Sequence, residues 1–120
     1  MLNELKKQST QLTKQRAVRR CHLVASAEVT ELRSGARLSA RISELGLGGC
    51  YVDALNPFPQ GTLVGVRILR DQGVFETKAR VVYCDPRFGM GLAFMETMPD
   101  QRSLLEAWLA EIVSRLSLSS

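Results

Sequence analysis

The sequence predicts a mainly β domain, an antiparallel barrel or sandwich closed by one helix at its C-terminal end. Two observations support this prediction. Apolar and polar residues alternate with a period of two over most of the chain, and the period becomes helical only after Pro99. Strands and helices do not alternate, so a parallel α/β fold is not expected. A length of 120 residues fits one domain, and 45% apolar with 23% charged residues is typical of a globular protein.

Six short segments show the period of two that is typical of half-buried strands, and turn-forming residues separate them. The separators are residues 33–35, the glycines within 46–49, the Pro-rich loop 56–61, and the turns 71–73 and 85–87. The third strand is the short segment 50–52. In the other five, the residues that share one face are Leu23, Ala25, Ala27 and Val29; Leu38, Ala40 and Ile42; Val64, Val66 and Ile68; Phe75, Thr77, Ala79, Val81 and Tyr83; and Met90, Leu92 and Phe94.

The last segment changes to helical spacing. Pro99 suits the first helical position, where its missing N–H is not needed, and Asp100 favours the positive N-terminal end of a helix. Apolar residues then recur at helical intervals, which predicts an amphipathic helix of about four or five turns packed on the β body. These residues are Leu104, Leu105, Trp108, Leu109, Ile112, Val113 and Leu116.

Positive charge is concentrated near the N-terminus. The net charge is +4, yet residues 1–22 hold six Lys and Arg against Glu4 alone, so the remaining 98 residues sum to −1. Anions are the natural partners of such a basic arm, whether a phosphate-bearing ligand, a nucleic acid or a membrane surface. We expect residues 1–13 to be a polar, mobile leader, residues 14–116 to form the domain and residues 117–120 to be a short tail.

The composition argues against several classes of protein. No apolar run approaches the roughly 18 residues of a membrane span, and the N-terminus lacks a signal-peptide pattern, so we expect a cytoplasmic protein. Three widely spaced cysteines argue against a disulfide framework and a zinc site. His22 is the only histidine, interpreted as a surface residue, and no catalytic motif accompanies it. We therefore predict a protein that is not an enzyme and has no catalytic residues, metal or cofactor.

One feature that rises above this background is a pair of arginines where the leader meets the first strand. Arg16 and Arg20 stand four residues apart, with Arg19 between them. Each guanidinium group offers a bidentate fork to a phosphate or a flat face to a purine. A solvated charge run is an equally good interpretation of this pattern alone.

The other feature is a carboxylate followed by glycines. Glu44 comes just past a strand end and precedes Gly46, Gly48 and Gly49. Such a carboxylate, beside backbone that a ligand can approach closely, complements the N1–H and N2–H edge of guanine. The alternative is a Gly-rich turn with an incidental acid.

Together, the two features resemble the PilZ family, which carries R-x-x-x-R before its first strand and [D/N]-x-S-x-x-G at the end of its second. Arg16 and Arg20 match the first motif. Segments 48–52 and 89–94 and the closing helix also resemble the family, so the likeness spans roughly residues 14–116. The acid, serine and glycine positions of the second motif are occupied by Glu44, Gly46 and Gly49.

The resemblance implies a six-stranded antiparallel β-barrel with a C-terminal α-helix, and cyclic di-GMP as its ligand. It further implies that Arg16 and Arg20, with Arg19 as an additional basic residue, grip phosphate and stack on guanine. In the same scheme Glu44 takes the guanine edge and Gly49 lets the backbone approach. A signalling module of this kind passes its message to an effector protein.

Two departures from the family pattern bear on the ligand. Glu44 carries its carboxylate one methylene further out than Asp, and Gly46 lacks the serine hydroxyl. One lost hydrogen bond costs about 0.5–1.5 kcal/mol, roughly a factor of two to ten in affinity. A PilZ-like adaptor that binds a protein and not the dinucleotide therefore stays open as an alternative. A nucleic-acid-binding barrel is disfavoured, because the few aromatic residues lie mostly on the inferred core faces.

Overall fold

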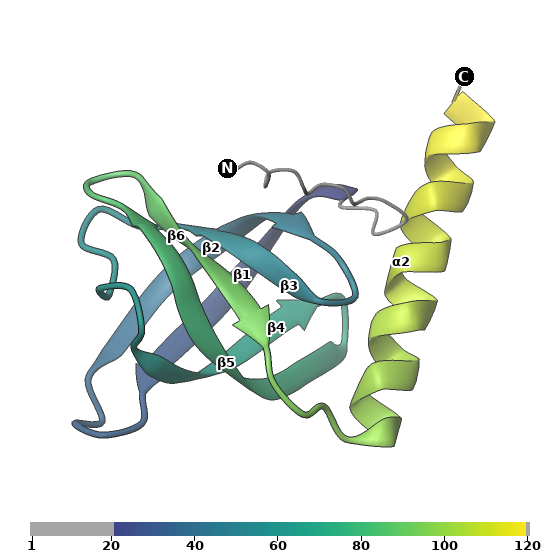
Figure 1. Cartoon of the computed structure of the whole chain (residues 1–120). Helices are drawn as coiled ribbons and strands as arrows, with labels where there is room; N and C mark the ends of the chain where they lie inside the picture. The colour runs from purple at the N-terminus through teal and green to yellow at the C-terminus, as the bar shows by residue number, and fades with distance from the viewer. Residues whose placement is uncertain (1–20, 120) are drawn as a thin grey trace, which may run out of the picture.

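The computed structural model describes residues 21–119, which fold into a closed barrel of six antiparallel strands with one helix standing beside it (Figure 1). Around the barrel the strand order is β1-β2-β3-β6-β5-β4. The predicted fold class is confirmed, and the arrangement is a barrel rather than a sandwich. The elements are β1 Cys21–Glu31, β2 Arg37–Leu45, β3 Gly49–Asp53, β4 Leu63–Arg70, β5 Gly73–Asp85, β6 Gly89–Phe94 and α2 Pro99–Ser119.

The core fills the barrel interior, and all six strands contribute to it. Because successive residues of a strand point to opposite faces, the period of two in the sequence places one apolar set inside. Leu23, Leu38 and Phe94 pack against this core while staying partly exposed. The hydrophobic core residues with no exposed surface are Val29, Ile42, Leu45, Cys50, Val52, Val64, Ile68, Phe75, Ala79, Val81 and Met90.

One core-face prediction is wrong. The alternation through residues 75–83 places Tyr83 inside the barrel, yet Tyr83 is 39% exposed. The register between β5 and β6 shifts between Val81 and Tyr83. An extra residue at such an irregularity moves the following side chains to the opposite face. Tyr83 therefore lies on the outer surface, while its neighbour Cys84 pairs with the buried Met90.

The helix α2 packs on the barrel through its apolar stripe. Leu105 and Trp108 join the core cluster, and the Trp108 and Phe75 ring centroids are 6.5 Å apart. The Arg70 guanidinium lies 5.9 Å from the centroid of Trp108, and its Nη1 donates to Oε1 of Glu111 at 2.6 Å. The helix has 21 residues, about six turns, and is longer than the periodicity predicts. Within residues 21–119, no helix combines the length and apolar character needed to cross a membrane.

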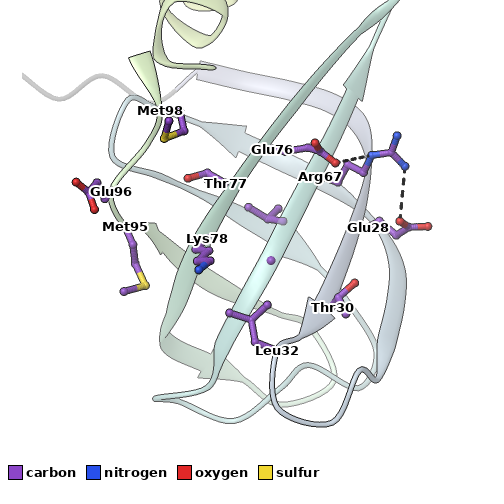
Figure 2. A pocket seen from close by; sticks show the side chains of 12 residues that line it. Glu28, Thr30, Leu32, Arg67, Glu76, Thr77, Lys78, Met95, Glu96 and Met98 are labelled. Atoms are coloured by element: carbon purple, nitrogen blue, oxygen red, sulfur yellow. Dashed lines mark ion pairs between the residues drawn. The ribbon is translucent and has the colours of Figure 1, made fainter. Parts of the chain in front are cut away.

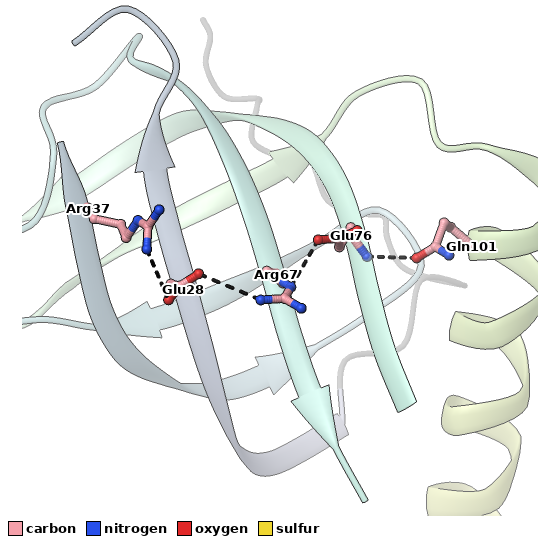
Figure 3. Close-up of polar contacts among 5 residues, drawn as sticks. All are labelled: Glu28, Arg37, Arg67, Glu76 and Gln101. Atoms are coloured by element: carbon pink, nitrogen blue, oxygen red, sulfur yellow. Dashed lines mark hydrogen bonds and ion pairs between the residues drawn. The ribbon is translucent and has the colours of Figure 1, made fainter. Parts of the chain in front are cut away.

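A ladder of alternating charges crosses the outer face of β2, β1, β4 and β5 (Figure 3). Glu28 lies 3.9 Å from Arg37 and 4.0 Å from Arg67, and Nε of Arg67 lies 3.0 Å from Oε2 of Glu76. The strand register sets this order, since Arg67 lies opposite both glutamates. Oε1 of Gln101 accepts the Glu76 N–H at 2.7 Å and so ties the start of α2 to β5. Exposed pairs contribute at most about 1 kcal/mol each, so the ladder favours the register more than it adds stability.

Candidate ligand-binding face

The β2–β3 connection brings the residues of the second sequence motif together at one corner of the barrel. Glu44 is the penultimate residue of β2, Gly46 follows the end of that strand, and Gly49 opens β3. The Gly46 N–H donates to the Gly49 carbonyl oxygen at 2.9 Å, which closes the connection. The three predicted residues thus form one compact backbone unit.

The two motif glycines differ in what the backbone requires of them. A Cβ on Gly49 would overlap the carbonyl oxygen of Leu92 on β6, so packing alone explains that glycine. Gly46 is different, because the glycines with positive φ among the described residues are Gly35 and Gly61. A serine at position 46 would therefore meet no φ strain.

A β-bulge turns Glu44 to the outside of the barrel. Ile42 lies opposite Val52, and both side chains are in the core. The next pair is Glu44 opposite Tyr51, which leaves Ser43 as the extra residue of β2. Glu44 and Tyr51 therefore lie side by side on the outer face.

The strand registers extend this pair into a row across five strands. His22 of β1 lies opposite Glu44, Tyr51 lies opposite Gly91 of β6, and Gly91 lies opposite Tyr83 of β5. Residues directly opposite each other share a face, with Cβ atoms roughly 5 Å apart. We call His22, Glu44, Tyr51, Gly91 and Tyr83 the outer row. His22 is exposed, so its interpretation as a surface residue is confirmed.

The two tyrosine rings of the outer row lie over glycines of β6. A Cβ on Gly89 would lie 2.8 Å from Cε2 and Cζ of Tyr51, and a Cβ on Gly91 would overlap the Tyr83 ring. The ring centroids are 6.1 Å apart, with 29° between the planes. Tyr51 Oη donates to Oδ2 of Asp85 at 2.8 Å. Burial, followed by this hydrogen bond and the negative charge of Asp85, raises the pKa of Tyr51 to about 12, so the phenol stays protonated.

Sequence reasoning missed both tyrosines, because it assigned Tyr83 to the core and gave Tyr51 no role. The glycines at 89 and 91 were the available signal, since glycine within a strand often marks close approach by another group. Phe88, in the β5–β6 hairpin, is also 75% exposed. The expectation that aromatic residues lie mostly on core faces therefore needs correction for these three. The aromatic residues that do pack in or against the core are Phe58, Phe75, Phe94 and Trp108.

Arg16, Arg19 and Arg20 lie outside the described residues, as does the predicted leader 1–13. Chain connectivity joins Arg20 to Cys21, the first residue of β1, and Cys21 lies opposite Leu45. The arginine motif is therefore linked directly to the corner of the barrel that holds Glu44.

A second surface is a groove of about 790 Å³ on the outside of β1, β4 and β5 (Figure 2). Gly65 lies between Thr30 and Lys78 in the strand register, and its missing side chain leaves a hollow there. The lining holds three glutamates against two cations, which disfavours a polyanionic ligand. Its more exposed apolar residues are Leu32, Met95 and Met98.

Among residues 21–119, no three His, Cys, Asp or Glu side chains lie close enough together to hold a metal ion. Cys21 and Cys50 are buried and Cys84 is half-buried, as expected for small thiols with apolar neighbours.

Comparison with solved structures finds the same barrel in bacterial proteins. The PilZ domain of YcgR from Escherichia coli, solved with c-di-GMP, has a TM-score of 0.70 at 16% identity and covers 88% of this chain and 97% of its own. The inhibitor of motility MotI/DgrA from Bacillus subtilis has a TM-score of 0.66 at 19% identity over 84% of this chain and 53% of its own. The PilZ domain of CeSA from a cellulose-synthesizing bacterium has a TM-score of 0.60 at 16% identity, covering 80% of this chain and 96% of its own. At these identities the likeness shows the fold alone.

Comparison of the sequence with known families and curated proteins shows more than this likeness of fold. No curated protein matches this chain at a significant level. Residues 13–111, however, match the family described as PilZ domain, which is most of the chain and includes both motifs. The chain therefore belongs to the PilZ domain family.

Proposed function

We propose that this PilZ domain is a non-enzymatic receptor that binds cyclic di-GMP between the N-terminal arginines, Arg16, Arg19 and Arg20, and the outer face of the barrel at Glu44. The observation that supports this most strongly is the β2–β3 bulge. It turns Glu44 outward, opposite His22, which follows Arg20 by two residues. The described chain therefore begins, at Cys21 and His22, at the corner of the barrel that holds the second motif. The YcgR domain, which has the same fold, was solved with c-di-GMP, and this supports the choice of ligand.

Each part of the site has a distinct chemical task in this proposal. The guanidinium groups of the arm neutralise the phosphates and stack on a guanine. The Glu44 carboxylate accepts from N1–H and N2–H of a guanine. The backbone of the connection between Gly46 and Gly49 lies beside the ligand, while the missing side chain of Gly49 is required by its packing against Leu92. Because Gly46 has no hydroxyl, we expect binding roughly two- to tenfold weaker than with a serine there.

In this proposal the N-terminal arm passes the signal from the ligand to an effector protein. The arm folds over the ligand, and residues 14–116 with ligand present a surface that the ligand-free domain does not. A cytoplasmic effector protein that prefers this surface shifts the equilibrium toward the bound state. The domain needs no catalytic group for this task.

Isothermal titration calorimetry with cyclic di-GMP tests the proposal. We expect saturable binding that Arg20→Ala abolishes. Arg37→Ala is the matched control, since its side chain is 69% exposed and it opens β2 at the end opposite Glu44. No heat from the wild-type protein at high micromolar ligand would refute the receptor function.

The alternative is a PilZ-like adaptor that binds a protein and not the dinucleotide. Two observations favour it: Gly46 in place of the family's serine, and the groove beside Gly65, whose mixed lining exposes Leu32, Met95 and Met98. In that case a partner crosslinked to the domain is retained by Arg20→Ala and lost with Gly65→Val, which fills the hollow. The receptor function predicts instead that the partner is lost with Arg20→Ala and retained with Gly65→Val.

A further inference from the structure

Each tyrosine ring of the outer row turns one face away from the barrel. The inner face of Tyr51 covers Gly89 and that of Tyr83 covers Gly91, so the opposite faces point outward. Tyr83 is well exposed, and the hydrogen bond to Asp85 holds the Tyr51 ring in place. A ring that is already fixed loses little freedom when a flat ligand stacks on it.

The spacing along the row suits a purine. The Tyr51 ring lies over Gly89 of β6, two strands or roughly 10 Å from the β2 backbone of Glu44. The width of a purine stacked on that ring, together with the length of the Glu44 side chain, spans this distance. Tyr51 and Tyr83 are on strands separated by β6, roughly 10 Å apart in the sheet. Their ring centroids are nevertheless only 6.1 Å apart, because both rings lean over the glycines of β6. Together they form one aromatic floor of about the width of a fused ring system.

Carboxylates border the tyrosines on this face. The β1 end of the outer row carries His22, two residues after Arg20, the last arginine of the motif. At the other end, Asp53 and Asp85 both lie opposite Gly89 and so flank the tyrosines. Carboxylates repel phosphate and accept from the N–H donors of guanine. With Glu44 on β2, these carboxylates border the tyrosines on more than one side, so the face favours the N–H edge of a base over a phosphate at this place.

We propose that Tyr51 and Tyr83 form a stacking platform for a guanine of cyclic di-GMP, the one whose edge is taken by Glu44. This inference rests on the proposed receptor function and adds two binding residues to it. Base–aromatic stacking is tolerant of sequence, so the tyrosines supply affinity while the carboxylate supplies selectivity for guanine.

The test compares three variants by calorimetry with cyclic di-GMP. Tyr83→Leu keeps an apolar cover over Gly91 but removes the aromatic face, and we expect binding to weaken about 5- to 150-fold. Tyr83→Phe keeps that face and should bind like wild type. Phe88→Leu, which removes an exposed aromatic ring outside the outer row, should also leave affinity unchanged. A thermal melt of each variant checks that the barrel is intact.

Nuclear magnetic resonance gives a second readout, because a stacked base shifts the ring protons of both tyrosines upfield. Weaker binding by Tyr83→Leu alone, together with these shifts, supports the platform. If wild-type protein binds, Arg20→Ala does not, and Tyr83→Leu binds as tightly as wild type without ring shifts, the platform is wrong and the receptor function stands. If wild-type protein does not bind, the receptor function fails and the platform fails with it.

Discussion

Replacing Gly65 with valine tests how the outer face of β4 is built. A Cβ on Gly65 would meet only Cδ2 of Leu32, at an ordinary contact distance of 3.6 Å, and φ at Gly65 is not positive. Glycine within a strand costs about 0.5–1 kcal/mol relative to alanine, and a β-branched residue suits a strand better still. We therefore expect Gly65→Val to raise the free energy of unfolding by about 0.5–1 kcal/mol. For a domain of this size, that corresponds to a Tm increase of about 2–4 °C.

The matched variant is Gly91→Ala on β6, where the same kind of change should act in the opposite direction. The added methyl group would overlap the Tyr83 ring, so the ring has to move. Overpacking of this kind costs about 1–3 kcal/mol, a Tm decrease of roughly 4–12 °C. Scanning calorimetry of both variants measures the two shifts. A lower Tm for Gly65→Val, or an unchanged Tm for Gly91→Ala, would contradict the argument that free space beside Gly65 and the Tyr83 ring beside Gly91 decide the direction of the Tm change.

Three further predictions concern other parts of the domain. Gly46→Ser restores the hydroxyl of the family motif without φ strain, so its cyclic di-GMP affinity by calorimetry should rise about two- to tenfold; an unchanged affinity would mean that this position does not face the ligand. Ultraviolet titration of the folded protein should show Tyr51 ionising near pH 12, and Asp85→Asn should lower that pKa. Because this pKa lies above the ordinary value of 10.0, the phenol contributes stability that is fully present below pH 10 and lost as the pH rises toward 12. Trp108→Ala removes a nearly buried side chain that contacts Phe75 and should lower the free energy of unfolding in urea by about 3–5 kcal/mol; a loss below 1 kcal/mol would show that α2 docking adds little.

The features that depend on neighbours along the chain were predictable from the sequence. Phe75, Ala79 and Val81 follow the period of two, and all three are fully buried. Pro99 begins α2, as its fixed φ and missing N–H predict. Glu44 and the motif glycines are close in sequence, so their convergence at one hairpin required only that the hairpin form.

The features that depend on strand register were not predictable in the same way. A single extra residue, Ser43, decides that Glu44 lies beside Tyr51 on the outside. A similar irregularity near Val81 carries Tyr83 out of the core. Each irregularity shifts the alternation by one residue, as between the buried Ile42 and Leu45, and near the end of a strand the sequence does not distinguish such a shift from the end of the strand itself.

Closure of the barrel limits how a protein effector engages this domain. Between residues 21 and 119, every strand is hydrogen-bonded to another strand on each side. Within residues 21–119, an effector therefore finds only short stretches of unpaired strand, such as residues 21–25 of β1 beside β4 and residues 37–40 of β2 beside β3, to which it could add a β-strand of its own. We expect recognition to rest mainly on side chains of the barrel wall, the loops or the helix. The same closure leaves little template for edge-to-edge association, so the domain can expose tyrosines and methionines for recognition with less risk of aggregation.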